Sequence, residues 1–133
     1  MSGLLTTARW RELADDLPES PDAVRALVVA YLALLPLRTL ALTRALHAGD
    51  AVAVRTAARS LHVGSAMVGA HLLADRCHAV ERHVAAQGCD QDAARSVEAA
   101  RDAADATGRV LVALLRRCDE LVAHAPDGLD PAR

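Results

Sequence analysis

Three short interruptions divide most of this chain into segments that must fold back on one another. They lie at residues 49–50, 69–70 and 88–90, and each begins with a glycine. Between them, apolar residues recur at steps of three and four, which is the spacing of one face of an α-helix. Because connections this short join neighbouring antiparallel helices, the sequence predicts an all-α fold. The expected architecture is an antiparallel up-down-up-down four-helix bundle with a short additional helix at its N-terminus.

Capping and helix-breaking residues set the expected boundaries of these helices. The first helix is expected from Thr6 or Thr7 to about Asp16, the second from Ser20-Pro21-Asp22 to Gly49, the third from Asp50 to near Gly69, the fourth from Ala70 to about Gln87, and the fifth from near Asp90 past Leu121. Pro36 is expected to kink the second helix, because it removes a backbone donor and crowds the preceding turn. We therefore expect one domain over residues 1–124 and a disordered tail over residues 125–133.

The apolar stripes also identify the residues expected to face the core. Hydrophobic residues make up 53% of the chain and phenylalanine is absent, so the core should consist mainly of alanine, leucine and valine. The inward residues predicted for the second to fifth helices are Val24, Leu27, Val28, Tyr31, Leu32, Leu35, Leu42 and Leu46; Val54, Ala58, Leu61, Ser65 and Val68; Leu73, Cys77, Val80 and Val84; and Val97, Ala100, Ala104, Thr107, Leu111, Leu114, Cys118 and Leu121. Cys77 and Cys118 lie too far apart along the bundle to form a disulfide. Cys89 is the only thiol expected to be exposed, and the single aromatics Trp10 and Tyr31 are expected to pack in the core.

Charge and hydropathy argue against two classes of partner. A net charge of -2 does not supply the clustered positive surface that nucleic acid requires. The longest stretch without a charged residue is residues 60–74, which is too short and too polar to span a bilayer. The N-terminus has no basic segment leading into an apolar one, and three cysteines without metal-type spacing fit a reducing compartment. These features predict a soluble, cytoplasmic protein.

Two segments carry a recognisable pattern. Residues 58–70 read Ala-Arg-Ser-Leu-His-Val-Gly-Ser-Ala-Met-Val-Gly-Ala, and residues 73–81 read Leu-Ala-Asp-Arg-Cys-His-Ala-Val-Glu. They resemble the signature of histidine-containing phosphotransfer (HPt) domains, which is roughly Ala-His-x-Leu-Lys-Gly-Ser-Ser/Ala-x-x-hydrophobic-Gly-Ala, followed by Leu-Ala-x-x-Cys-x-x-hydrophobic-Glu. The resemblance extends over about residues 8–122. It implies an HPt-like bundle in a bacterial two-component phosphorelay, where a histidine receives a phosphoryl group from an aspartyl phosphate or a kinase.

The reactive positions of that pattern are altered. Arg59 stands in the place of the phospho-accepting histidine, and a guanidinium that is always protonated cannot act as a nucleophile. Val63 stands where the family has a glycine that lets a receiver domain approach, and Gly64 comes one position late. His62 stands in the place of the family's lysine, which lies three residues after its histidine and offers positive charge to the phosphoryl group. The resemblance therefore indicates a pseudo-phosphotransfer protein, not an enzyme and without a cofactor, that binds a receiver domain or a histidine kinase as adaptor or competitor.

Helical geometry places the altered positions on an outer surface. At about 100° per residue, Arg59 lies roughly 140° from the centre of the inward stripe of its helix, and His62 lies nearer the edge of the core. The guanidinium of Arg59 suits the acidic pocket of a receiver domain, although a solvated arginine is the alternative interpretation. The expected partner-binding residues are Arg55, Arg59, His62, Val63, Ala66, His71, Asp75 and His78.

Two alternatives remain open at this point. His62, with Arg55 and Arg59 nearby, is a candidate phospho-acceptor in an active phosphorelay intermediate, although it is displaced by about 4.5 Å along the helix from the usual position. His71, Asp75 and His78 share a helix face with metal-ligand spacing, and pairing of the third and fourth helices places His62 level with His78. The second alternative is a helical interaction or metal-binding protein unrelated to phosphorelay. The leading expectation is that the chain holds no metal.

Overall fold

The computed structural model describes residues 21–123, and within this range the chain forms four α-helices and no strand. The helices are α2 (Pro21–His47), α3 (Ala51–Met67), α4 (His71–Gln87) and α5 (Gln91–Ala123). The all-helical fold and the four helices of the bundle are therefore confirmed. The predicted helix over residues 6–16, the core position of Trp10 and the tail over residues 125–133 lie outside the described residues.

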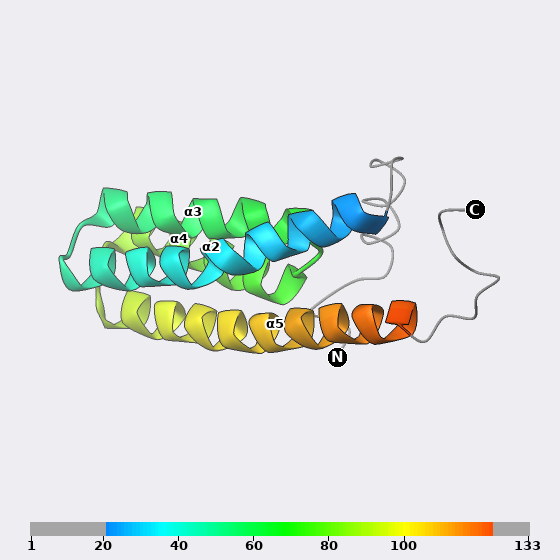
Figure 1. Cartoon of the computed structure of the whole chain (residues 1–133). Helices are drawn as coiled ribbons and strands as arrows, with labels where there is room; N and C mark the ends of the chain where they lie inside the picture. The colour runs from blue at the N-terminus through cyan, green and yellow to red at the C-terminus, as the bar shows by residue number, and fades with distance from the viewer. Residues whose placement is uncertain (1–20, 124–133) are drawn as a thin grey trace.

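The four helices pack around one core. α3 packs most extensively on α4, α4 packs on α5, and α2 contacts both α3 and α5. Figure 1 shows that the α2–α3 and α4–α5 connections lie at one end of the bundle and the α3–α4 connection at the other. Because α3 and α5 both pack on α2 and on α4 but not extensively on each other, they lie on opposite sides of the core, and a surface on α3 is separated from most of α5.

The turns lie where the interruptions predicted them. Gly49, Gly69 and Gly88 have φ angles of 66°, 79° and 76°, a left-handed conformation that only glycine adopts without steric cost. At the start of α3, the Asp50 carboxylate accepts a hydrogen bond from the backbone N–H of Ala53 at 3.0 Å, which satisfies one of the unpaired donors of the first turn. Each predicted helix boundary in this range is thus correct to within about two residues.

The predicted core is largely confirmed. Every inward residue predicted in α3 and α4 is buried, including the polar Ser65. Of the residues predicted to face inward in α2, five are buried and three are half-buried: Val24, Val28, Tyr31, Leu35 and Leu42 are buried, and Leu27, Leu32 and Leu46 are half-buried. In α5 the buried stripe continues as far as Leu111. Most of this core consists of small aliphatic side chains, as the composition predicted, because leucine, valine and alanine fill the space between closely packed helices.

The inward prediction was wrong for the last third of α5. Leu114 is 38% exposed and Cys118 is exposed. α5 has 33 residues whereas α3 and α4 have 17 each, so at about 1.5 Å per residue α5 extends past the ends of both (Figure 1). In this part of α5, Leu115 still packs against the core, and an exposed Arg25–Asp119 ion pair at 3.0 Å joins the helix to the start of α2.

The prediction for Cys89 was also wrong. Its side chain is half-buried and packs against the core cluster. Cys77 is buried as predicted, and all three cysteines are free. The exposed thiol of the described chain is therefore Cys118 and not Cys89.

α2 combines a proline with a strongly apolar sequence. Pro36 lies inside a continuous helix, and in Figure 1 the N-terminal half of α2 slopes relative to its C-terminal half. Its segment Asp22–His47 is long and apolar enough to cross a membrane by length and composition, with a mean hydropathy of 1.9 over its most apolar window, of which 22% is buried. The core helix of a soluble protein and a signal sequence near an N-terminus have the same length and composition, so the cytoplasmic location stays a prediction.

Candidate functional site

The outer face of α3 presents two arginines and a valine to solvent. Arg55 and Arg59 are exposed, and the side chain of Val63 is 51% exposed. These residues lie opposite the buried stripe of the same helix, and Ala66 beside them is half-buried. The predicted outward orientation of Arg59 is therefore confirmed.

A shallow groove between α2 and α3 extends this apolar surface. Leu34 of α2 and Val63 and Met67 of α3 line the groove, and Leu34 and Met67 are 41% and 47% exposed. A solvated helix face seldom gathers three large exposed apolar side chains, whereas a binding surface often does. Of this set the sequence predicted only Val63. Met67, four residues later on the same helix, could have been placed from helical spacing, whereas the contribution of Leu34 depends on how α2 and α3 are rotated about their axes.

Gly64 serves the packing of α2 against α3. A Cβ atom at this position would lie 2.9 Å from a guanidinium nitrogen of Arg38 and 3.9 Å from the ring of Tyr31. The glycine thus lets two large side chains of α2 approach the backbone of α3. Next to it, the Tyr31 hydroxyl and the Ser65 hydroxyl share a buried hydrogen bond of 2.7 Å. Burial of Tyr31 raises the pKa of its phenol, and the Ser65 hydrogen bond partly offsets this.

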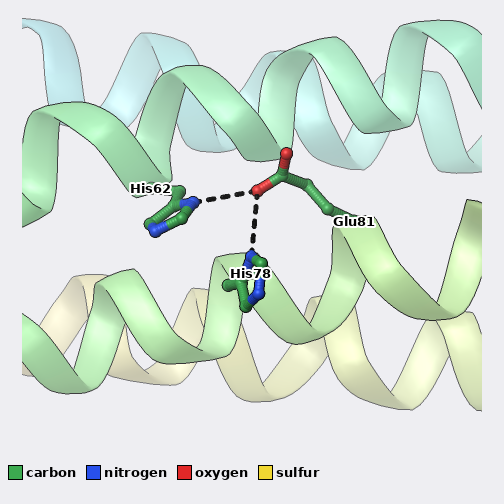
Figure 2. A group of neighbouring side chains, drawn as sticks. All are labelled: His62, His78 and Glu81. Carbon is green, nitrogen blue, oxygen red and sulfur yellow. Dashed lines mark hydrogen bonds and ion pairs between the residues drawn. The ribbon is translucent and has the colours of Figure 1, made fainter.

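Two histidines and a glutamate meet on the other side of α3, between α3 and α4. Nδ1 of His62 lies 3.0 Å from Oε2 of Glu81, and Nδ1 of His78 lies 3.7 Å from the same oxygen. The two imidazole rings are 4.9 Å apart between centroids. Figure 2 shows His62 reaching across from α3 while His78 and Glu81 both project from α4. One carboxylate oxygen therefore connects both rings.

The contact with Glu81 determines the chemical state of His62. A neutral imidazole carries one proton, and a carboxylate next to Nδ1 favours the tautomer in which Nδ1–H donates to it. The lone pair then lies on Nε2, on a ring whose side chain is 34% exposed. Glu81 is only 18% exposed, so its charge is less screened than that of a surface carboxylate.

Cys77 lies in the core beside this cluster and does not share its chemistry. Burial, together with a smaller contribution from the charge of Glu81, raises the pKa of its thiol to about 12. The thiol is therefore protonated at neutral pH, and a protonated thiol is a poor nucleophile and a poor metal ligand.

The structure brings together some of the predicted site residues and separates others. Within residues 21–123, the group of three metal-binding side chains close enough to share an ion is His62, His78 and Glu81. This group includes neither half-buried His71 nor exposed Asp75. The predicted helix face of His71, Asp75 and His78 therefore does not bring three ligand atoms together. Glu81 was missed as a site residue, although its spacing of three from His78 on one helix was a usable signal.

Comparison of the chain with protein-family models, with curated proteins and with solved structures finds no match. The resemblance to HPt domains therefore depends on the sequence pattern described above, and it stays a prediction.

Proposed function

We propose that this protein is an HPt-like, pseudo-phosphotransfer signalling protein of a bacterial two-component phosphorelay. It binds a receiver domain or a histidine kinase as an adaptor or competitor and carries no phosphoryl group itself. In this proposal the bundle has the antiparallel up-down-up-down topology of an HPt domain, and the protein acts in the cytoplasm without nucleic acid, membrane, metal or cofactor taking part in docking.

The observation that carries the proposal is an exposed arginine beside an exposed apolar groove. Arg59 occupies the place of the family's reactive histidine and is exposed, and Val63, one helical turn later, lines the groove with Leu34 and Met67. An apolar centre with a charged rim is typical of protein interfaces. The guanidinium of Arg59 offers a planar set of donors to the carboxylates of a receiver's acidic pocket.

The scaffold supports the same proposal. Ala58, Leu61 and Ser65, which match the HPt pattern, are buried in the core, whereas Arg59 and Val63, which depart from it, are exposed. A fold kept intact beneath an altered surface suits a protein that must still be recognised by the partner but cannot react with it.

The docking test compares arginines on opposite sides of the bundle. We expect Arg59→Ala to weaken binding of an isolated receiver domain by about 2 kcal/mol or more, as for an arginine hot spot. Charge reversal to Glu should weaken it further, because like charges then face each other. Arg109→Ala is the matched control, since Arg109 is an exposed arginine of α5. Calorimetric titration of the partner against the four proteins measures the effect, and equal affinity for all four would disprove the docking role.

A second candidate function is phosphotransfer at His62, and the contact with Glu81 favours it. With Nδ1–H directed at Glu81 across 3.0 Å, Nε2 of His62 is free to attack a phosphorus atom. In such a transfer the new P–N bond would form as the acyl-phosphate P–O bond of a receiver aspartate breaks, and the aspartate would leave as a carboxylate.

Incubation with phosphorylated receiver domains and with an autophosphorylated kinase separates the two functions. The leading proposal expects no acid-labile phosphate on the chain. Label that disappears in His62→Ala, and persists in His47→Ala as the control for an exposed histidine elsewhere, would establish the second candidate. Label that persists in His62→Ala would contradict both, because it would place the phosphoryl group on another residue.

A further inference from the structure

We propose that His62, His78 and Glu81 form a binding site for a divalent transition-metal ion, with Zn²⁺ as the best match to its donor atoms. His62 and His78 are also among the residues expected to contact a partner, but the metal site itself requires neither Arg59 nor a partner protein and can be tested without them. The donor set of two imidazoles and one carboxylate is a combination that binds zinc and other first-row metals in proteins.

The distances in the cluster are close to those that such an ion needs. With metal–ligand bonds of about 2.0 to 2.2 Å, two ligands of a tetrahedral zinc are about 3.3 Å apart. The His62 Nδ1 to Glu81 Oε2 distance is 3.0 Å and the His78 Nδ1 to Glu81 Oε2 distance is 3.7 Å. The three ligand atoms all lie within 4.8 Å of one another. The ligand nitrogens of the two histidines must therefore move closer by at most about 1.5 Å on the same scale.

That movement falls on the side chain that is freest to make it. The side chain of His78 is 51% exposed, compared with 34% for His62 and 18% for Glu81. A rotation about the side-chain bonds of His78 therefore adjusts the site without disturbing the core. The extensive packing of α3 on α4 fixes the backbone on both sides of the site. Metal binding therefore does not have to supply the conformational entropy lost when the two helices come together.

The arrangement of the ligands along the chain also suits chelation. His78 and Glu81 are three residues apart on α4 (Figure 2), a spacing that places side chains next to each other on one helix face. The third ligand comes from a different helix, so all three are together only in the folded bundle. Metal binding should therefore stabilise the native state, since the unfolded chain offers at most the local pair.

The site supplies three protein ligands and leaves at least one coordination position to water or to a partner's side chain. Cys77 is buried and is not among the side chains that converge at the site. A zinc site with three protein ligands and an open position differs from closed structural sites, which have four protein ligands. The metal ion at this site would therefore be accessible and would exchange its fourth ligand.

The test uses the untagged full-length chain and Zn²⁺ alone, titrated by calorimetry. We expect one ion per chain and a metal-dependent rise in the melting temperature. His78→Ala and Glu81→Gln should each weaken binding by about tenfold or more, because loss of even an indirect partner of a metal ligand costs 10–100-fold. Glu81→Gln retains hydrogen bonding to His62 and removes only the negative charge. A loss of Zn²⁺ affinity in this variant would therefore show that the carboxylate of Glu81 is a metal ligand. Co²⁺ as a second probe should give a visible absorption spectrum of low coordination number that His78→Ala abolishes.

Two matched controls keep the proposal falsifiable. His71→Ala changes another histidine of α4 that lies outside the cluster, and Cys118→Ser removes the exposed thiol; both should bind Zn²⁺ as the unmodified chain does. Absence of saturable binding would overturn the site. Binding lost in His71→Ala or Cys118→Ser but kept in His78→Ala would overturn it as well, because the ion would then be held elsewhere. None of these outcomes bears on receiver docking, which is measured with Arg59 variants.

Discussion

The buried hydrogen bond between Tyr31 and Ser65 should stabilise the contact of α2 with α3, and a double-mutant cycle can measure how much. The two hydroxyls are 2.7 Å apart, Ser65 is fully buried and Tyr31 is 6% exposed. Ser65→Ala should leave the phenol hydroxyl buried without its partner, at a cost of about 1 to 3 kcal/mol in the free energy of unfolding.

The reverse substitution should cost less. In Tyr31→Phe the Ser65 hydroxyl can turn to the backbone carbonyl of Leu61, four residues earlier in the same helix, as buried serines in helices commonly do. We expect a cost of about 1 kcal/mol. The double variant removes both hydroxyls, so it should be more stable than the sum of the single costs predicts, and the difference is the coupling energy.

Urea unfolding followed by circular dichroism gives the four free energies, and unchanged denaturant slopes would show that the comparison is valid. Thr107→Val is the matched control, since Thr107 is a fully buried hydroxyl of α5 that has no hydrogen-bond partner among the described residues. Removing an unpaired hydroxyl should leave stability unchanged or raise it. Single costs that add to within about 0.5 kcal/mol would refute the reasoning, because they would mean that the two hydroxyls do not interact.

Two further predictions concern the core and its titratable groups. Leu61→Ala and Leu73→Ala should each lower the free energy of unfolding by about 2 to 5 kcal/mol, because both side chains are almost fully buried. Chemical unfolding measures this cost. Val52→Ala is the control, since Val52 is a 71% exposed side chain of α3. Stability should also fall as the pH rises above 9. In the folded protein the pKa of Cys77 is raised from 9.0 to about 12, mainly by burial, and the pKa of Tyr31 is raised above 10.0. The unfolded chain therefore loses these protons at a lower pH than the folded protein, which favours unfolding as the pH rises. Unfolding measured between pH 7 and 11 should show a smaller loss in Cys77→Ala, and an equal loss in that variant would contradict the assignment.

The helices and their buried faces could be predicted because both depend on local properties of the sequence. Glycines at 49, 69 and 88 end helices through their own backbone conformation, and the inward stripe of α3 follows from a spacing of three and four. The stripe of α5 was predicted correctly as far as Leu111 and failed at Leu114 and Cys118. Periodicity shows which face of a helix is apolar, but it does not show how far the neighbouring helices extend.

The sequence could predict which side chains of the candidate site point outward, but it could not predict their contacts with other helices. The outward position of Arg59 needs only the rotation per residue along one helix. The contact of Arg38 with Gly64 and that of His62 with Glu81 join different helices, so they depend on the rotation and axial shift of one helix relative to another. An error of one residue in that shift moves a side chain by about 1.5 Å along the axis, which is half the length of the hydrogen bond in question.

His62 cannot serve as a phospho-acceptor and a metal ligand at the same time. Attack by Nε2 on phosphorus requires the proton of the neutral ring to be on Nδ1, facing Glu81. Binding of a metal ion through Nδ1, the nitrogen that lies 3.0 Å from the carboxylate oxygen, requires Nδ1 to be deprotonated and moves the proton to Nε2. An ion at this site would thus remove the nucleophile that the second candidate function needs. A metal-loaded cluster is for this reason consistent with a protein that docks through Arg59 and transfers no phosphoryl group.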